Sequence, residues 1–166
     1  PQAKQAPSKP DPATAARLAR ERAASQQAEQ ARQQAAHADA ALEAVKLWES
    51  ASETGESAYL TRKGVQPYGV RFGADGWLLV PVSDASGKLW NVQRIAADKP
   101  ASGPEKLFLK GARKSGLWHM CGDPAGAAVL LIAEGYATAA SLHQATGRTV
   151  AVAFDAGNLV HVAKAL

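Results

Sequence analysis

The sequence is poor in cysteine and has no long apolar run. Its single cysteine, Cys121, excludes an internal disulfide and a cysteine-rich zinc site, and it is typical of a protein from a reducing compartment. No stretch approaches the roughly 20 apolar residues that span a bilayer, and no charged-then-apolar signal sequence opens the chain. We therefore expect a soluble, cytoplasmic protein without zinc and without a membrane partner.

Several motifs of nucleotide and hydrolase chemistry are also missing. The chain has neither a Gly-rich phosphate loop with its lysine nor a dinucleotide-binding GxGxxG. Its four histidines are scattered, and their spacing supports no Ser–His–Asp arrangement. His119 and Cys121 share one face of a predicted strand, but no further soft ligand is near them, which argues against zinc.

The composition of the first third of the chain favours a helix but includes few large apolar side chains. Residues 1–12 are rich in Pro, Lys and Gln and predict a disordered tail. Residues 13–55 form an Ala/Gln-rich helical region, with Asp11 as N-cap and Pro12 at the first helical position.

Only the end of this helix carries a stripe of large apolar side chains. Leu42, Val45 and Trp48 are spaced by three residues and are expected to dock the helix on the rest of the protein. The stretch before Leu42 has too few large apolar side chains for a coiled-coil seam, so we expect it to be exposed.

Residues 56–122 alternate short β-rich segments with turns and predict a small antiparallel module. Segments 68–72 and 77–82 flank a hairpin turn at Asp75-Gly76, and segment 88–95 returns beside them. Pro81 places its strand at an edge or near a strand end. Two further short strands, 107–109 and 117–120, are predicted on either side of a basic turn.

All of the net positive charge lies in this module. Residues 56–120 carry ten Lys and Arg against five Asp and Glu, whereas residues 1–55 balance at seven each and 121–166 carry two against three. A local basic surplus is expected of a protein that binds a polyanion. On charge alone, a basic surface that only maintains solubility is equally compatible.

A strand–helix–strand unit follows the basic module. The apolar run 129–133 predicts a buried strand that ends at Glu134, and Gly135 allows the turn into a helix over 137–145. A second apolar strand covers 149–154 and ends at Asp155. Glu134 therefore lies at the carboxyl edge of a parallel sheet, where such sheets bind ligands, although an acid there also favours a helix N-terminus through the dipole.

The segments Leu-Ile-Ala-Glu-Gly-Tyr-Ala-Thr-Ala and Val-Ala-Phe-Asp-Ala-Gly-Asn-Leu together resemble the first half of a Toprim domain. The version they most resemble occurs in DNA primases of conjugative plasmids, integrative elements and phages. Tyr-Leu-Thr-Arg-Lys-Gly-Val, Leu-Leu-Val-Pro-Val-Ser-Asp and Lys-Leu-Phe-Leu-Lys-Gly-Ala-Arg-Lys-Ser-Gly are similar to segments of the primase subdomain before it. The resemblance covers roughly residues 56–166.

The resemblance implies an α+β fold with a long N-terminal helix, a small antiparallel β module and the start of a parallel α/β (Toprim-like) sheet over 127–166. In that family the Toprim acids hold Mg²⁺ or Mn²⁺, and Glu134 matches the first acid as metal ligand and catalytic residue. Asp155 is a weaker candidate, because it matches the loop after the second strand. The family's paired acids follow a third strand, which we expect beyond Leu166, so this segment should hold half a metal site at best and be inactive alone.

The same resemblance assigns six basic residues to binding of single-stranded template or nucleotide phosphates: Arg62, Lys63, Arg94, Lys110, Arg113 and Lys114. Tyr59, Trp90 and Trp118 lie between them in the sequence and suggest platforms for base stacking. The alternative is that the aromatic residues belong to the core and the charges are solvated, which we favour for Trp77 and Trp90.

The sequence is therefore interpreted as a fragment of a DNA primase that makes RNA primers on single-stranded DNA from nucleoside triphosphates. A replicative helicase is a further expected partner. Two other hypotheses stay open: a non-catalytic module that binds single-stranded DNA or a helicase, and another Toprim protein such as a nuclease or topoisomerase-like enzyme. An Asp-x-Asp motif after Leu166 would decide in favour of the Toprim enzymes.

Overall fold

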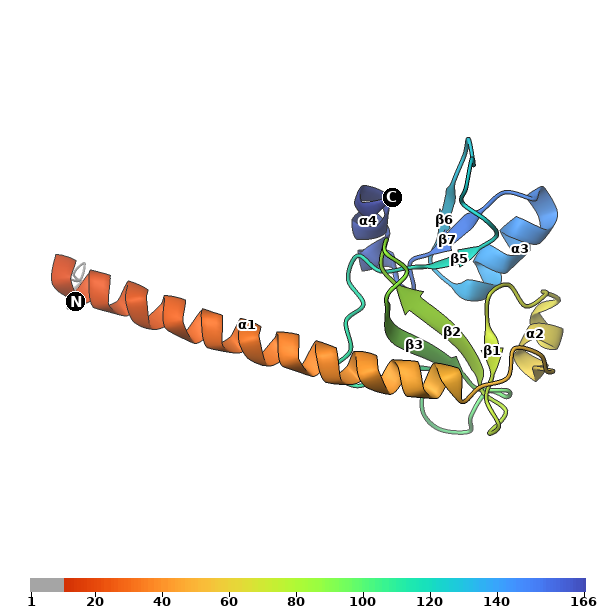
Figure 1. Cartoon of the computed structure of the whole chain (residues 1–166), viewed down its shortest axis with the longest axis horizontal. Helices are drawn as coiled ribbons and strands as arrows, with labels where there is room; N and C mark the ends of the chain where they lie inside the picture. Colours follow the sequence, from red (N-terminus) through yellow and green to blue (C-terminus); the bar gives the residue numbers. More distant parts are fainter. Residues whose placement is uncertain (1–10) are drawn as a thin grey trace, which may run out of the picture. The chain divides into compact units, whose positions relative to one another are not determined.

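The computed structural model describes residues 11–166 (Figure 1), so residues 1–10 of the predicted tail lie outside the described part. Helix α1 (Pro12–Glu49) begins where the sequence predicts. The Asp11 carboxylate accepts hydrogen bonds from the amides of Ala13 and Thr14, at 3.0 and 3.1 Å. The predicted N-cap is thereby confirmed, with Pro12 in the first helical turn, where its missing N–H costs nothing.

The face through which the end of α1 docks differs from the prediction. Leu42 is 65% exposed and Val45 is 37% exposed, so the expected stripe of large side chains is wrong at two of its three positions. The third position, Trp48, does pack against the protein, together with Leu47. The buried residues of α1 are small: Ala40, Ala41 and Ala44. Ala44 belongs to a cluster with Leu79 and Val92 of the first sheet, because small residues allow the helix backbone to approach the strands closely.

Replacing Ala44 with leucine should therefore destabilise the protein, by about 1–3 kcal/mol, because a fully buried alanine leaves no room for the added carbons. Leu42→Ala should change the free energy of unfolding by less than about 0.5 kcal/mol, because that side chain is mostly in solvent. Urea unfolding of both variants measures the difference. A larger loss for Leu42→Ala would restore the original docking prediction.

The first sheet is antiparallel, with strand order β1-β2-β3-β4. After helix α2 (Ala58–Lys63), its strands are β1 (Arg71–Phe72), β2 (Leu78–Ser83), β3 (Leu89–Ile95) and β4 (Lys106–Phe108). The predicted hairpin turn is present, and Gly76 adopts a φ of +81° that suits glycine. β2 lies between β1 and β3, so it is not an edge strand. However, β1 pairs only with Leu78 and Leu79, and Pro81 therefore has a neighbouring strand on one side only, that of β3.

The second sheet is mixed rather than purely parallel. Its strands are β5 (His119–Cys121), β7 (Val150–Val152) and β6 (Leu131–Ala133), in that order. β6 and β7 run parallel, as the sequence predicts, but β5 pairs antiparallel with β7. The segment predicted to close the antiparallel module thus belongs to the other sheet, because an apolar alternation specifies a strand without specifying its partner.

Two helices cover opposite faces of the second sheet, as Figure 1 shows. Helix α3 (Tyr136–Thr146) packs with Val150 and Val152, whereas helix α4 (Ala156–Ala165) packs with Ala151 through Val162.

None of the helices between residues 11 and 166 has the length and apolarity needed to cross a membrane.

The two sheets share one core. A backbone bridge joins Ser83, at the end of β2, to Trp118, just before β5. One cluster of buried residues includes Val80 of the first sheet, Val152 of the second and Tyr136 of α3. Residues 36–166 therefore form a single compact unit that contains both sheets.

Candidate functional site

Glu134 and Asp155 lie at the same edge of the second sheet. Glu134 is exposed and directly follows β6, and Asp155 comes three residues after the end of β7. Ala133 is paired with Val152 in the parallel ladder, and the amide of Ala153 donates to the carbonyl of Ala133 at 2.8 Å. The predicted strand–helix–strand unit with an acid after each strand is therefore present.

Both carboxylate oxygens of Asp155 already have partners. One accepts a hydrogen bond from the amide of Asn158 at 2.9 Å and caps helix α4, and the other forms an ion pair with the Lys114 ammonium. The hydrogen bond from Lys114 is the main reason that the pKa of Asp155 is lowered from its usual value. These contacts favour a structural role for Asp155, as a cap and as an anchor for Lys114.

The described residues do not complete a metal site at this edge. Between residues 11 and 166 no group of three or more His, Cys, Asp or Glu side chains is arranged to hold a metal ion. Mg²⁺ demands near-octahedral oxygen ligation and is usually held by one or two carboxylates together with substrate phosphates and water. Glu134 fits the role of one such ligand, but by itself it does not fix the ion.

Lys106 lies near Gly135, the residue after Glu134, and the sequence did not indicate this position. Its Nζ is 3.9 Å from the position that a Cβ atom would take at Gly135. The same Nζ lies 5.6 Å from the ring centroid of Tyr59, a fully buried residue. The available signal was the lysine that opens the Lys-Leu-Phe-Leu segment, which forms β4, the outer strand of the first sheet. Among residues 11–166, Lys106 has no carboxylate within 4 Å, so its charge is not used in an ion pair there.

Two buried asparagines hold the basic loop between β4 and β5. The side-chain oxygen of Asn91 accepts from the amide of Leu109 at 3.2 Å, and its amide group donates to the carbonyl of Arg113, also at 3.2 Å. Asn158 of α4 is 3% exposed and binds the other end of the loop. One asparagine belongs to each half of the unit, so the loop is fixed across both sheets.

Asn158 is the more extensively bonded of the two. Its side-chain oxygen accepts from the Gly116 amide at 2.7 Å. Its side-chain nitrogen donates to the carbonyls of Ala153, Leu117 and Lys114 at 2.8, 3.0 and 3.3 Å. These bonds hold Lys114 against Asp155 and above the ring of Phe108, whose centroid is 5.2 Å from the ammonium. No local sequence pattern indicates these long-range bonds.

Three of the six predicted nucleic-acid-binding residues are already paired with carboxylates. Arg62 pairs with Glu105 at 2.6 Å, Arg94 with Asp75 at 2.8 Å, and Lys114 with Asp155. The other three have no carboxylate within 4 Å in the described part of the chain: Lys63, Lys110 and Arg113.

The six residues are also not gathered on one surface. Arg94 is opposite Leu107 in the ladder between β3 and β4, so its side chain lies on the other face of the sheet from Lys106 and Phe108. Arg94 stacks on Trp77 instead, at 4.5 Å from the ring centroid. The structure brings Lys114 to Asp155 and Lys106 to Gly135, and it leaves Arg94 on the opposite face of the first sheet.

The predicted stacking platforms are mostly unavailable. Tyr59 is fully buried and Trp118 is 8% exposed, so neither presents a ring to a nucleic-acid base. Trp90 is half-buried and packs against the main core, as the alternative prediction had it. Alternation along a strand indicates the face on which a ring lies, but not what covers that face.

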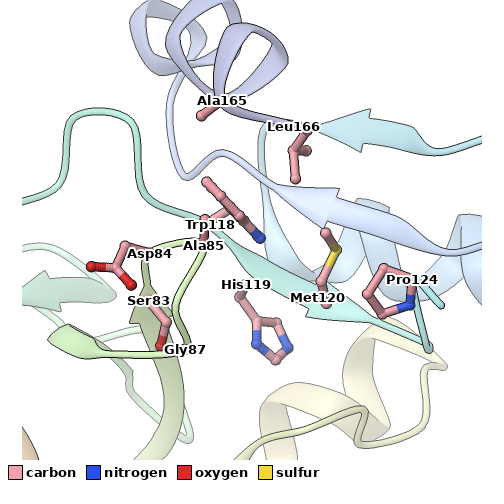
Figure 2. Close-up of a pocket in the computed structure, with 10 residues that line it drawn as sticks. All are labelled: Ser83, Asp84, Ala85, Gly87, Trp118, His119, Met120, Pro124, Ala165 and Leu166. Carbon is pink, nitrogen blue, oxygen red and sulfur yellow. The ribbon is translucent and has the colours of Figure 1, made fainter.

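A pocket of about 460 Å³ opens elsewhere, between the turn after β2, strand β5 and the end of α4 (Figure 2). It is lined by none of the predicted site residues, and its walls include Trp118, Met120 and Leu166. His119 also lines it, but the Nε2 of this histidine is 2.8 Å from the carbonyl oxygen of Tyr68. Burial lowers the pKa of His119 to about 4, which keeps the ring neutral near pH 7. We assign His119 a structural role.

Comparison with known proteins links the chain to DNA primases. It is 38% identical over 162 residues to a protein of Escherichia coli named DNA primase TraC, and 42% identical over 113 residues to a second E. coli protein of that name. The alignments cover 94% and 65% of this chain but only 15% and 8% of the two relatives. No family model matches the chain. No solved structure matches it either. The similarity supports the interpretation of the chain as a segment of a primase.

Proposed function

We propose that this chain is part of a DNA primase and that the edge carrying Glu134 belongs to its nucleotidyl-transfer site. The observation that carries the proposal is the exposed carboxylate of Glu134 at the carboxyl end of β6, together with the Lys106 ammonium near the next residue, Gly135. Lys106 forms no ion pair among residues 11–166. Similarity to segments of two proteins named DNA primase supports it independently.

The order of the second sheet supports a Toprim-like completion in a longer protein. Among the described strands, β6 is bonded to β7 alone and has an open edge. Helices α3 and α4 lie on opposite faces, and crossovers between parallel strands are right-handed. A parallel strand after α4 would therefore lie on the open side of β6. Its carboxyl end would bring further side chains next to Glu134, at a switch point where such sheets bind ligands.

Each of the chain's residues at this edge would have its own role. Glu134 would supply one oxygen ligand to Mg²⁺ or Mn²⁺, an ion that neutralises phosphate charge when it is bound. Lys106 would contact nucleotide phosphate through its ammonium group. Lys114 is already paired with Asp155, so it would not bind phosphate directly and would contribute mainly to the local electrostatic potential. A helicase partner and a cytoplasmic location are further proposals, based on the primase resemblance alone.

A second candidate function is a non-catalytic module that binds single-stranded DNA. The incomplete metal site of the described residues favours it, together with unpaired cations such as Lys63, Lys110 and Arg113. The two functions differ in whether a longer protein that includes this segment needs Glu134 for synthesis.

The 166-residue chain should bind single-stranded DNA weakly and make no primers. Binding should weaken as salt rises, because phosphate contacts release counterions, and synthesis should fail because one carboxylate does not fix the metal. Fluorescence anisotropy with a labelled oligonucleotide measures the first result. Incorporation of labelled ribonucleotides on a single-stranded template, with Mg²⁺ or Mn²⁺, measures the second. A template-dependent product that disappears in Glu134→Ala would contradict this expectation.

A further inference from the structure

Trp90 has two cations over its ring, Lys88 and Arg113, of which the sequence indicated only Arg113 as a binding residue. The Nζ of Lys88 lies 3.9 Å from the ring centroid, and the guanidinium carbon of Arg113 lies 5.1 Å from it. Lys88 is exposed, and Arg113 is partly exposed. Neither has a carboxylate within 4 Å in residues 11–166, so both charges remain uncompensated by ion pairs there.

The ring itself is held in place by Asp84. The indole N–H of Trp90 donates to one carboxylate oxygen of Asp84 at 2.7 Å. The other oxygen accepts from the hydroxyl and amide of Ser86 and from the amide of Lys88. The hydrogen bonds from Ser86 and Trp90 lower the pKa of Asp84 to about 2, so the carboxylate stays charged at neutral pH. The turn between β2 and β3 thus fixes both the aromatic ring and the start of the Lys88 side chain.

Arg113 reaches the same ring from a distant part of the sequence. Its carbonyl accepts a hydrogen bond from Asn91, the residue after Trp90 on β3. The basic loop therefore places Arg113 over the ring through its backbone, and the stacked guanidinium keeps its N–H edge available for other partners. Two long side chains that are normally mobile are ordered by one aromatic surface, which reduces the entropy lost when they bind an anion.

We propose that Lys88, Trp90 and Arg113 form a clamp for the phosphate backbone of single-stranded DNA. The proposal rests on the proposed function and adds to it the place where the template is held. Phosphate is assigned rather than a base, because the two cations occupy the ring that would otherwise stack. The clamp should not discriminate between sequences, since backbone contacts carry no base information.

The first test compares two double variants of the 166-residue chain that lose equal charge. Lys88→Ala/Arg113→Ala should lower affinity for single-stranded DNA roughly tenfold near 0.1 M salt and flatten the slope of log K against log salt by about one to two units. The control, Lys46→Ala/Lys164→Ala, removes one exposed lysine from α1 and one from α4. It should change both quantities much less. Equal effects of the two pairs would overturn the clamp.

The second test removes the ring without changing the charge. Trp90→Leu should weaken binding about two- to fivefold, because the cations lose the surface that orders them, and Trp90→Phe should lose less. Attraction by diffuse charge alone predicts no change in either variant, and that result would overturn the clamp. Circular dichroism checks folding; if Trp90→Leu does not fold, Trp90→Phe and the double variants decide.

Two further outcomes separate this inference from the proposed function. If the unmodified chain binds DNA and the clamp variants bind equally well, the clamp is wrong and DNA binding stands. If the unmodified chain fails to bind single-stranded DNA at all, DNA binding by this segment is wrong and the clamp falls with it. Polyglutamate of matched charge serves as a competitor: affinity equal to that of DNA would contradict the assignment of phosphate as the ligand.

Discussion

Glu134→Gln in a longer protein that includes this segment is expected to lower template-dependent primer synthesis by on the order of 100-fold or more. Groups that only orient a metal ligand cost roughly 10–100-fold in affinity or activity when they are removed. A direct ligand should cost at least as much, and glutamine keeps the size of the side chain while it removes the charge that the ion requires. The measurement is the initial rate of labelled ribonucleotide incorporation on single-stranded DNA.

Glu43→Gln is the matched control, because Glu43 is an exposed acid on α1. It should leave the rate unchanged. The competing interpretation of Glu134 is that it only favours the N-terminus of α3 through the dipole, a contribution of about 0.3–1 kcal/mol to stability. On that interpretation Glu134→Gln would lower the thermal midpoint slightly and retain most of the synthesis. Melting curves recorded alongside the rates distinguish the two interpretations.

Asn158→Ala is expected to destabilise the 166-residue chain by about 2–4 kcal/mol. The substitution removes hydrogen bonds to the Gly116 amide and to three carbonyls, including that of Ala153, in a place where little water replaces them. Each buried polar group left without a partner costs about 1–3 kcal/mol. Urea unfolding should show a lower midpoint with an unchanged slope.

Val160→Ala is the control for this substitution, because Val160 lies on the same helix and is 58% exposed. Its effect should stay below about 0.5 kcal/mol. A loss below about 1 kcal/mol for Asn158→Ala would show that the basic loop is not held through this side chain. Lys114 would then not depend on Asn158 for its position against Asp155.

The sequence by itself determined the features that depend on residues close together in the chain. Asp11 and Pro12 mark the start of α1, because a cap needs only the amides two and three residues ahead. Asp75-Gly76 marks the hairpin, because its turn requires a positive φ at Gly76. The apolar runs before Glu134 and Asp155 bring both acids to one sheet edge, because neighbouring parallel strands point the same way.

Only the tertiary structure decided which distant residues meet. β5 joins the second sheet, α1 buries three alanines that the periodicity did not indicate, and Lys106 comes to lie beside Gly135; none of these follows from local propensity or periodicity. The sequence also did not show which basic side chains form ion pairs. Composition counts Arg94 as a positive charge, but the structure pairs it with Asp75. Such contacts depend on how complete elements pack, and a pattern of a few residues holds no record of that packing.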